Sequence, residues 1–115
     1  EHEHDNSDLR FALFQQARSV AVKLGQYDVA MAAIDEMAEF FEIDPLPMKL
    51  EDLKACATAA ITKTQRRAVV IEALLAAEDA LAKDQLVIAK ALVGRAWTEA
   101  NRIGDSRLIR MWGLS

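Results

Sequence analysis

The chain has 115 residues, of which 52% are apolar and 28% are charged, and its formal net charge is −4. This length suits one domain with a continuous core, and a single cysteine excludes both an intramolecular disulfide framework and a cysteine-rich zinc site. No apolar run approaches the roughly 20 residues that cross a bilayer, no targeting segment is expected, and the acidic balance argues against nucleic acid as the partner.

Apolar residues recur at helical spacing along the chain, and alanine and leucine are the commonest residues. Because β-branched and aromatic residues never alternate with polar ones over a strand length, the predicted fold class is all-α. The first helix is predicted over residues 8–24, ending at Gly25, and residues 1–7 are expected to form a disordered tail. This helix needs one apolar neighbour for a stripe that consists of Leu9, Leu13, Gln16 or Ala17, Val20 or Ala21, and Leu24.

Further helices follow in chain order. The second pairs with the first as an antiparallel hairpin and ends before Asp44, because Pro45 and Pro47 forbid its continuation. A short sixth helix is predicted after Gly104. The predicted ranges of the second to fifth helices are 26–42, 46–61, 65–83 and 84–103.

The sequence repeats itself at a shift of 59 residues. This shift pairs Ala17 with Ala76, and Tyr27 with Leu86. The prediction is an internal duplication of a three-helix unit, with residues 8–62 as the first unit and 65–115 as a shortened second one. Repeat proteins cover their ends with polar caps, whereas Trp112 is an apolar residue near the end of this sequence. We therefore expect the chain to be part of a longer protein whose next helix covers Trp112. Alternatively, Trp112 folds back onto the preceding helix.

Two segments resemble parts of the tetratricopeptide repeat. They are the turn Gly25-Gln26-Tyr27-Asp28-Val29-Ala30 and the closing sequence Ile43-Asp44-Pro45. The alanine-rich pattern also looks like helical modules of large uncharacterised bacterial proteins. The resemblance implies a right-handed stack of five to six antiparallel helices with a role in protein–protein interaction. It places inner-face positions at Ala12, Gln15, Ser19, Val22 and Lys23, and in the second unit at Ile71, Leu74, Glu78 and Leu81.

The residues that could support chemistry are isolated from one another. Cys56 has no histidine near it in sequence and is predicted to be an inert core or boundary thiol. His2 and His4 fall in the terminal tail, and the four carboxylates of the second helix are expected on its solvated face. The glycines form no phosphate-binding motif. We therefore predict no catalytic, cofactor or metal site and no enzymatic activity.

Charge is distributed unevenly along the chain. Residues 1–52 carry twelve acidic and four basic side chains, whereas residues 83–115 carry three acidic and six basic ones. The partner-binding residues predicted from the basic end are Arg102, Arg107, Arg110 and Trp112. They could take an anionic partner, stack head-to-tail on the acidic start of another copy or of an adjacent repeat, or be ordinary surface side chains.

The predicted function is a non-enzymatic scaffold or protein-interaction module, within a longer bacterial protein. The alternative is a homo-oligomerisation module, for instance a homodimer, that pairs through the edge around Trp112. A third class, a small-molecule binder or enzyme with a groove between helices, would require a deep polar pocket. The cysteine-poor composition suits the cytoplasm, although the interior of an exported protein would fit as well.

Overall fold

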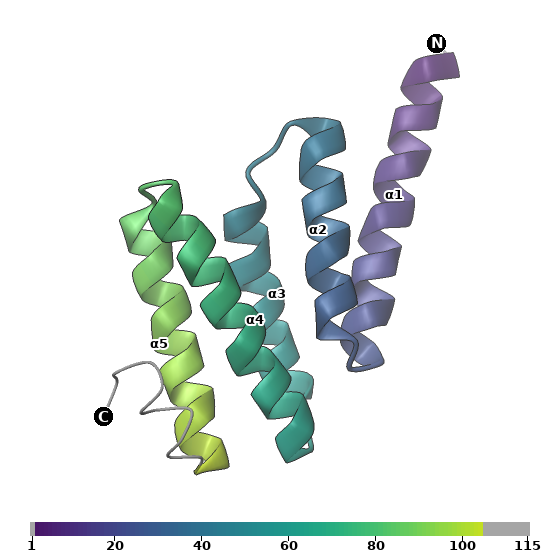
Figure 1. The fold of residues 1–115 in the computed structure, drawn as a ribbon. Helices are drawn as coiled ribbons and strands as arrows, with labels where there is room; N and C mark the ends of the chain where they lie inside the picture. Colours follow the sequence, from purple (N-terminus) through teal and green to yellow (C-terminus); the bar gives the residue numbers. More distant parts are fainter. Residues whose placement is uncertain (1, 105–115) are drawn as a thin grey trace.

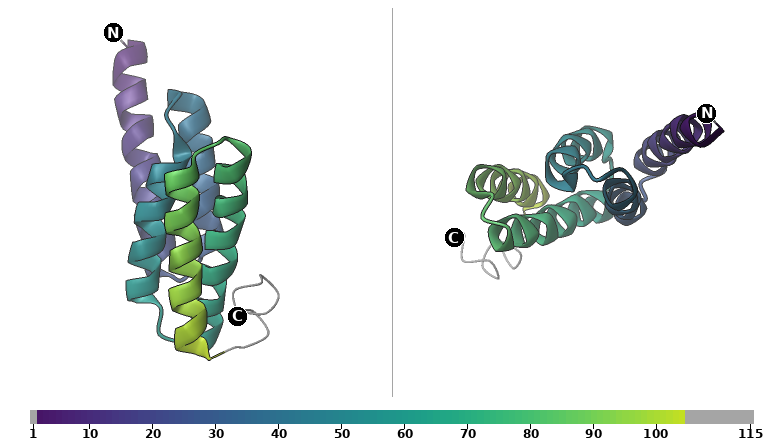
Figure 2. Two further views of the ribbon diagram at one scale, coloured as in Figure 1. Left: turned by 90° about the vertical axis from the view of Figure 1, so that its left-hand side faces the viewer. Right: turned by 90° about the horizontal axis from the view of Figure 1, so that it is seen from above.

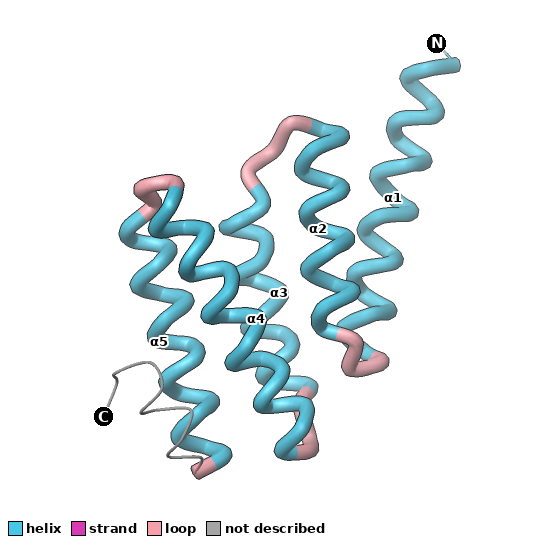
Figure 3. The backbone as a smooth tube through the Cα atoms, in the orientation of Figure 1, coloured by secondary structure: helices cyan, strands magenta, loops and turns pink. Residues whose placement is uncertain are grey.

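The computed structural model describes residues 2–104, and from residue 7 onward their side chains as well. These residues form an all-helical fold with no strand among them (Figures 1 and 3). None of these helices is long and apolar enough to cross a membrane. The helices are α1 (His2–Lys23), α2 (Tyr27–Phe41), α3 (Pro45–Ala59), α4 (Lys63–Ala82) and α5 (Leu86–Ile103).

The helices lie in two layers, as the view from above in Figure 2 shows. Helices α1, α3 and α5 form one layer, with α3 in contact with both neighbours, and α2 and α4 form the other. Successive helices run in opposite directions and contact each other, so the chain alternates between the layers. The result is a flat body of 55 × 32 × 15 Å with α1 at one edge.

The core lies between the two layers. Its largest fully buried side chains include Tyr27 and Ile34 from α2, Leu53 from α3 and Leu92 from α5. Alanines fill most of the remaining core positions on α4 and α5, which lets the helix axes approach closely. Buried residues recur at helical spacing on α2, at Tyr27, Ala30, Ile34 and Met37, and on α5, at Ala89, Ala96, Ala100 and Ile103.

Local chemistry sets the helix ends. Gly25 lies in the turn between α1 and α2 and adopts the left-handed conformation, with φ of 77°. The carboxylate of Asp44 accepts a hydrogen bond from the Leu46 amide at the start of α3, where Pro45 has no N–H that needs an acceptor. Thr62 and Gln65 form a reciprocal capping box at the start of α4.

The α1–α2 and α4–α5 turns have the same backbone hydrogen bonds at an offset of 59 residues. The Gln26 amide donates to the Ala21 carbonyl at 2.9 Å, and the Gln85 amide donates to the Ala80 carbonyl at 2.8 Å. Asp84 takes the left-handed conformation in the place of Gly25, with φ of 61°. The offset is the one at which the sequence matches itself.

The five predicted helices are all present, and their ends lie within two residues of the prediction except at the start of α1. That helix already begins at His2, whereas the sequence predicted a start at residue 8. The predicted sixth helix falls on residues 105–115, which lie outside the described part of the chain.

Candidate interaction surface

Helix α1 is apolar on two sides, and only one of them packs on the protein. Side chains of the outer side are half or more exposed at Leu9 (60%), Leu13 (59%) and Leu24 (65%), and Val20 is 44% exposed. We call these four residues the outer stripe. Successive members lie four, seven and four residues apart, so they share one helix face. Of the predicted apolar stripe, Ala21 is buried, whereas the four residues of the outer stripe lie on the side of α1 that α2 and α3 do not cover within residues 2–104.

The inner side of α1 is held by aromatic and ionic contacts. Phe11 and Phe14 pack edge-on against Phe41 of α2, with ring centroids 5.2 and 6.3 Å apart. The guanidinium of Arg18 binds Asp52 of α3 in a bidentate pair, with Nε–Oδ2 of 2.9 Å and Nη2–Oδ1 of 2.6 Å. These contacts fix the rotation of α1 and thereby point the outer stripe away from the body.

The end of the α1–α2 hairpin carries a further apolar cluster. Phe40 is 49% exposed, packs on Phe41, and lies under the guanidinium of Arg10 at 4.5 Å. An open hollow of 430 Å³ beside it is lined by Leu9, Arg10, Leu13 and Phe14. The outer stripe therefore continues into an aromatic surface at one end of α1.

The groove between α1 and α3 is lined by four of the five inner-face positions that the tetratricopeptide resemblance implies for the first unit. Its volume is 510 Å³. The pair of Arg18 and Asp52 crosses this groove, so its main charged groups are already matched to each other. The lining residues are Gln15, Arg18, Ser19, Val22, Lys23, Asp52 and Ala55. Of the inner-face positions implied for the second unit, Leu74 is buried in the core, whereas Ile71 and Leu81 are exposed.

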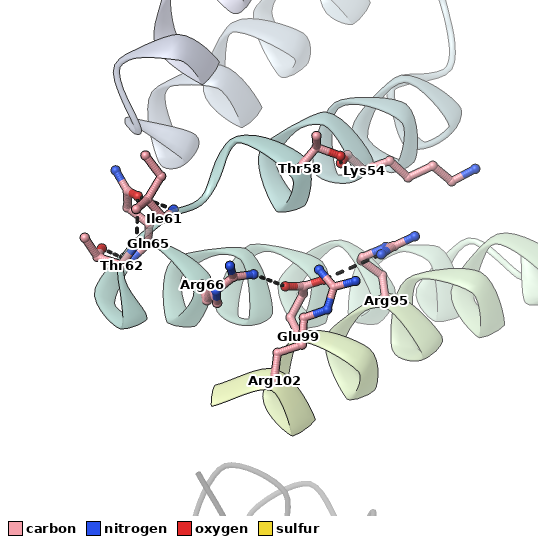
Figure 4. A network of polar contacts seen from close by, with 9 residues as sticks. All are labelled: Lys54, Thr58, Ile61, Thr62, Gln65, Arg66, Arg95, Glu99 and Arg102. Atoms are coloured by element: carbon pink, nitrogen blue, oxygen red, sulfur yellow. Dashed lines mark hydrogen bonds and ion pairs between the residues drawn. The ribbon is translucent and has the colours of Figure 1, made fainter. Parts of the chain in front are cut away.

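The most unusual polar feature lies between α4 and α5, where Glu99 is fully buried (Figure 4). Three arginines surround its carboxylate: Arg66 at 3.5 Å, Arg95 at 3.6 Å and Arg102 at 3.4 Å. Among the described residues Oε2 accepts no hydrogen bond, although two of the guanidiniums lie near it. Arg66 is the cation that connects α4 to the buried anion of α5, whereas Arg95 and Arg102 lie on the same helix as Glu99.

Of the predicted partner-binding residues, the structure describes Arg102. Its side chain is half exposed, and its charge faces Glu99 one turn earlier on α5. Arg107, Arg110 and Trp112 lie outside the described residues, so the predicted cluster, and self-association through Trp112, stay predictions. The buried Glu99 was not singled out from the sequence, because a lone glutamate among surface arginines resembles an ordinary helical ion pair.

A small acidic hollow of 240 Å³ lies between α2 and α4. Asp28 and Asp35 of α2 face Glu72 of α4 there, and Lys49 of α3 reaches across to bind Asp35 at 2.8 Å. Burial, followed by the charge of Asp28, raises the pKa of the Glu72 carboxyl. Among the described residues no group of three or more histidine, cysteine or carboxylate side chains is arranged to hold a metal ion.

The buried thiol of Cys56 lies on α3 within the core, as the sequence predicted. Burial raises its pKa to about 12, with a smaller contribution from the charge of Asp52. The thiol is thereby kept protonated at neutral pH.

Comparison with known proteins gives no relative for this chain. No protein-family model, no curated protein and no solved structure matches it.

Proposed function

We propose that this chain is a non-enzymatic protein-interaction module whose partner covers the outer stripe of α1. One observation carries the proposal: α1 is fixed to the body by its inner side while Leu9, Leu13 and Leu24 on the other side are each about 60% exposed. A helix with apolar residues on both sides resembles the internal helix of a stack rather than the edge of one. Contiguous exposed apolar surface of this kind is typical of interaction sites.

The shared geometry of the two hairpin turns supports the second part of the proposal. An identical hydrogen-bond pattern at the sequence offset of 59 favours a duplicated, tetratricopeptide-like unit in a right-handed stack. In such a stack each helix pair packs on the next one, and a scaffold grows by adding pairs. We propose that the chain works as one segment of such a scaffold, within a longer bacterial protein.

The buried polar groups support a structural rather than a catalytic role. Glu99 is surrounded by arginines, Lys49 is bound to Asp35, and the Cys56 thiol has a strongly raised pKa. The two charged groups are paired with opposite charges, and the thiol is protonated at neutral pH. A nucleophile would need an activating base beside it.

Site-specific photo-cross-linking tests the proposal. A photoreactive side chain at Leu13 should give discrete protein adducts in cells that produce the chain. Leu86 on α5 is the matched control because it is 62% exposed, against 59% for Leu13, and α5 makes no contact with α1 among the described residues. Equal adduct yields at the two positions would remove the reason for assigning interaction to the outer stripe.

A further inference from the structure

The four residues of the outer stripe are spaced symmetrically. Steps of four, seven and four residues separate Leu9, Leu13, Val20 and Leu24, and this order reads the same in both directions. Reversal about the midpoint between Gln16 and Ala17 places Leu9 on Leu24 and Leu13 on Val20. A two-fold interface has the same requirement, since residue i must contact residue j while j contacts i.

We infer that the outer stripe binds a second copy of this chain, with the two α1 helices antiparallel and the two-fold axis near Gln16 and Ala17. This inference rests on the proposed function and names the partner. Because α1 forms the edge of a flat body, two copies can meet there without a collision between their other helices (Figure 2).

The size of the stripe suits a weak dimer. Leu9 and Leu24 lie about 22 Å apart along the helix axis, so the contact covers four turns. With the exposed Gln16 and Ala17 included, we expect a total buried area of about 1,000 Å², near the lower limit for specific interfaces.

Two of the three charges on this part of α1 are already engaged within the chain. Between Leu9 and Leu24 the helix has basic side chains at Arg10, Arg18 and Lys23 and no acidic ones. Arg10 lies over Phe40, and Arg18 is bound to Asp52. Antiparallel pairing keeps the two copies of Lys23 about 20 Å apart along the axis and brings each level with Arg10 of the other copy, so the spacing of the outer stripe, rather than charge, sets the orientation.

The first experiment measures molar mass by sedimentation equilibrium over a range of concentrations. The 115-residue chain should change from monomer to dimer with rising concentration, and Leu13→Glu should raise the dissociation constant at least tenfold, because it places a charge in an apolar contact on both copies. Leu86→Glu, at an exposed position on α5, is the matched control and should leave the dissociation constant unchanged. Far-UV circular dichroism verifies that both variants keep their helices.

The second experiment tests orientation through disulfide formation. Gln16→Cys lies beside the proposed axis and should cross-link to its own copy under mild oxidation. Leu9→Cys alone should not, because its two copies would lie about 22 Å apart, but an equimolar mixture of Leu9→Cys and Leu24→Cys should cross-link. The buried Cys56 contributes no background.

Monomeric behaviour at every concentration, or efficient Leu9→Cys self-linkage, would overturn this inference. Adducts of a Leu13 photo-cross-linker with other proteins would then still support the proposed function. If Leu13 yields neither self-adducts nor adducts with other proteins, both proposals fail.

Discussion

Cys56 shows how burial alone can make a reactive residue inert. Its side chain is fully buried on α3, and burial raises the pKa of its thiol to about 12. At pH 8 only about one thiol in ten thousand would be ionised. We predict no reaction with a colorimetric thiol reagent in the native state and one equivalent after denaturation.

A matched control for this experiment is Leu13→Cys, which places a second thiol on the outer stripe. That thiol should react at once, while Cys56 stays protected. Reaction of Cys56 in the native chain at the rate of the exposed thiol would contradict its assignment to the core.

Among the charged side chains, we expect the removal of Glu99 to lower the free energy of unfolding the most. Glu99→Gln leaves Arg66, Arg95 and Arg102 facing each other without their shared anion. Because these arginines are partly exposed and can be rehydrated, we expect a loss of about 2 to 3 kcal/mol in the free energy of unfolding. Chemical denaturation measures this loss.

The control for the Glu99 variant is Glu78→Gln, which removes a carboxylate from an exposed position on α4. Its effect should stay within about 0.5 kcal/mol. If the two variants were equally stable, the arginine cluster would contribute nothing to the packing of α5 on α4.

At the scale of elements, the two hairpin turns have the same geometry but differ in the residue that adopts the left-handed conformation. It is Gly25 in the first turn and Asp84 in the second. Glycine adopts this conformation freely, whereas an L-residue with a Cβ atom is strained there. The two turns therefore allow opposite substitutions to be compared at equivalent positions.

We predict that Gly25→Ala lowers the free energy of unfolding by about 1 to 2 kcal/mol, and that Asp84→Gly raises it by about 0.5 kcal/mol. The added Cβ at position 25 would also lie 2.8 Å from Nε2 of Gln65, which must move aside. Thermal unfolding of both variants checks these signs. A stabilising Gly25→Ala would show that the turn does not require its left-handed conformation.

Helix α1 shows where sequence periodicity is ambiguous. The sequence contains two apolar faces on this helix, and the stronger pattern, with Leu9, Leu13 and Leu24, was assigned to the interior. The structure instead packs Phe14 inward, together with Ala21 from the predicted stripe. Periodicity reveals that a face is apolar, but it cannot show which neighbour that face meets.

At the scale of the whole molecule, pH should alter stability through the hollow between α2 and α4. The Glu72 carboxyl has a pKa above its ordinary value of 4.5, because of burial and then the charge of Asp28, with Asp35 adding to the effect and Lys49 opposing it. The folded protein therefore binds this proton more tightly than the unfolded chain does. Its contribution to stability falls as pH rises from 4.5 through the raised pKa.

We predict that Glu72→Gln removes this penalty and stabilises the fold near neutral pH, by about 0.5 kcal/mol or less, because the side chain is partly exposed. The advantage should vanish below pH 4.5, where the carboxyl is protonated in both states. Thermal unfolding of the two proteins across this pH range is the measurement. A variant that is less stable at neutral pH would contradict the raised pKa.

The sequence by itself determined the helical class, the five helices and most of their ends. These features depend on local interactions: the spacing of apolar residues, the prolines at 45 and 47, and the conformational freedom of Gly25. The burial of Cys56 was predictable too, since a lone thiol between alanines on a helix suits a core.

Only the tertiary structure decided which surfaces meet. The layer order buries Glu99 between α4 and α5, brings Glu72 opposite Asp28, and turns the outer stripe of α1 away from the body. Each of these results depends on contacts between residues far apart in the chain, and a helix's own periodicity contains no information about them. The candidate site was missed for the same reason, because its exposure is a property of the assembled helices.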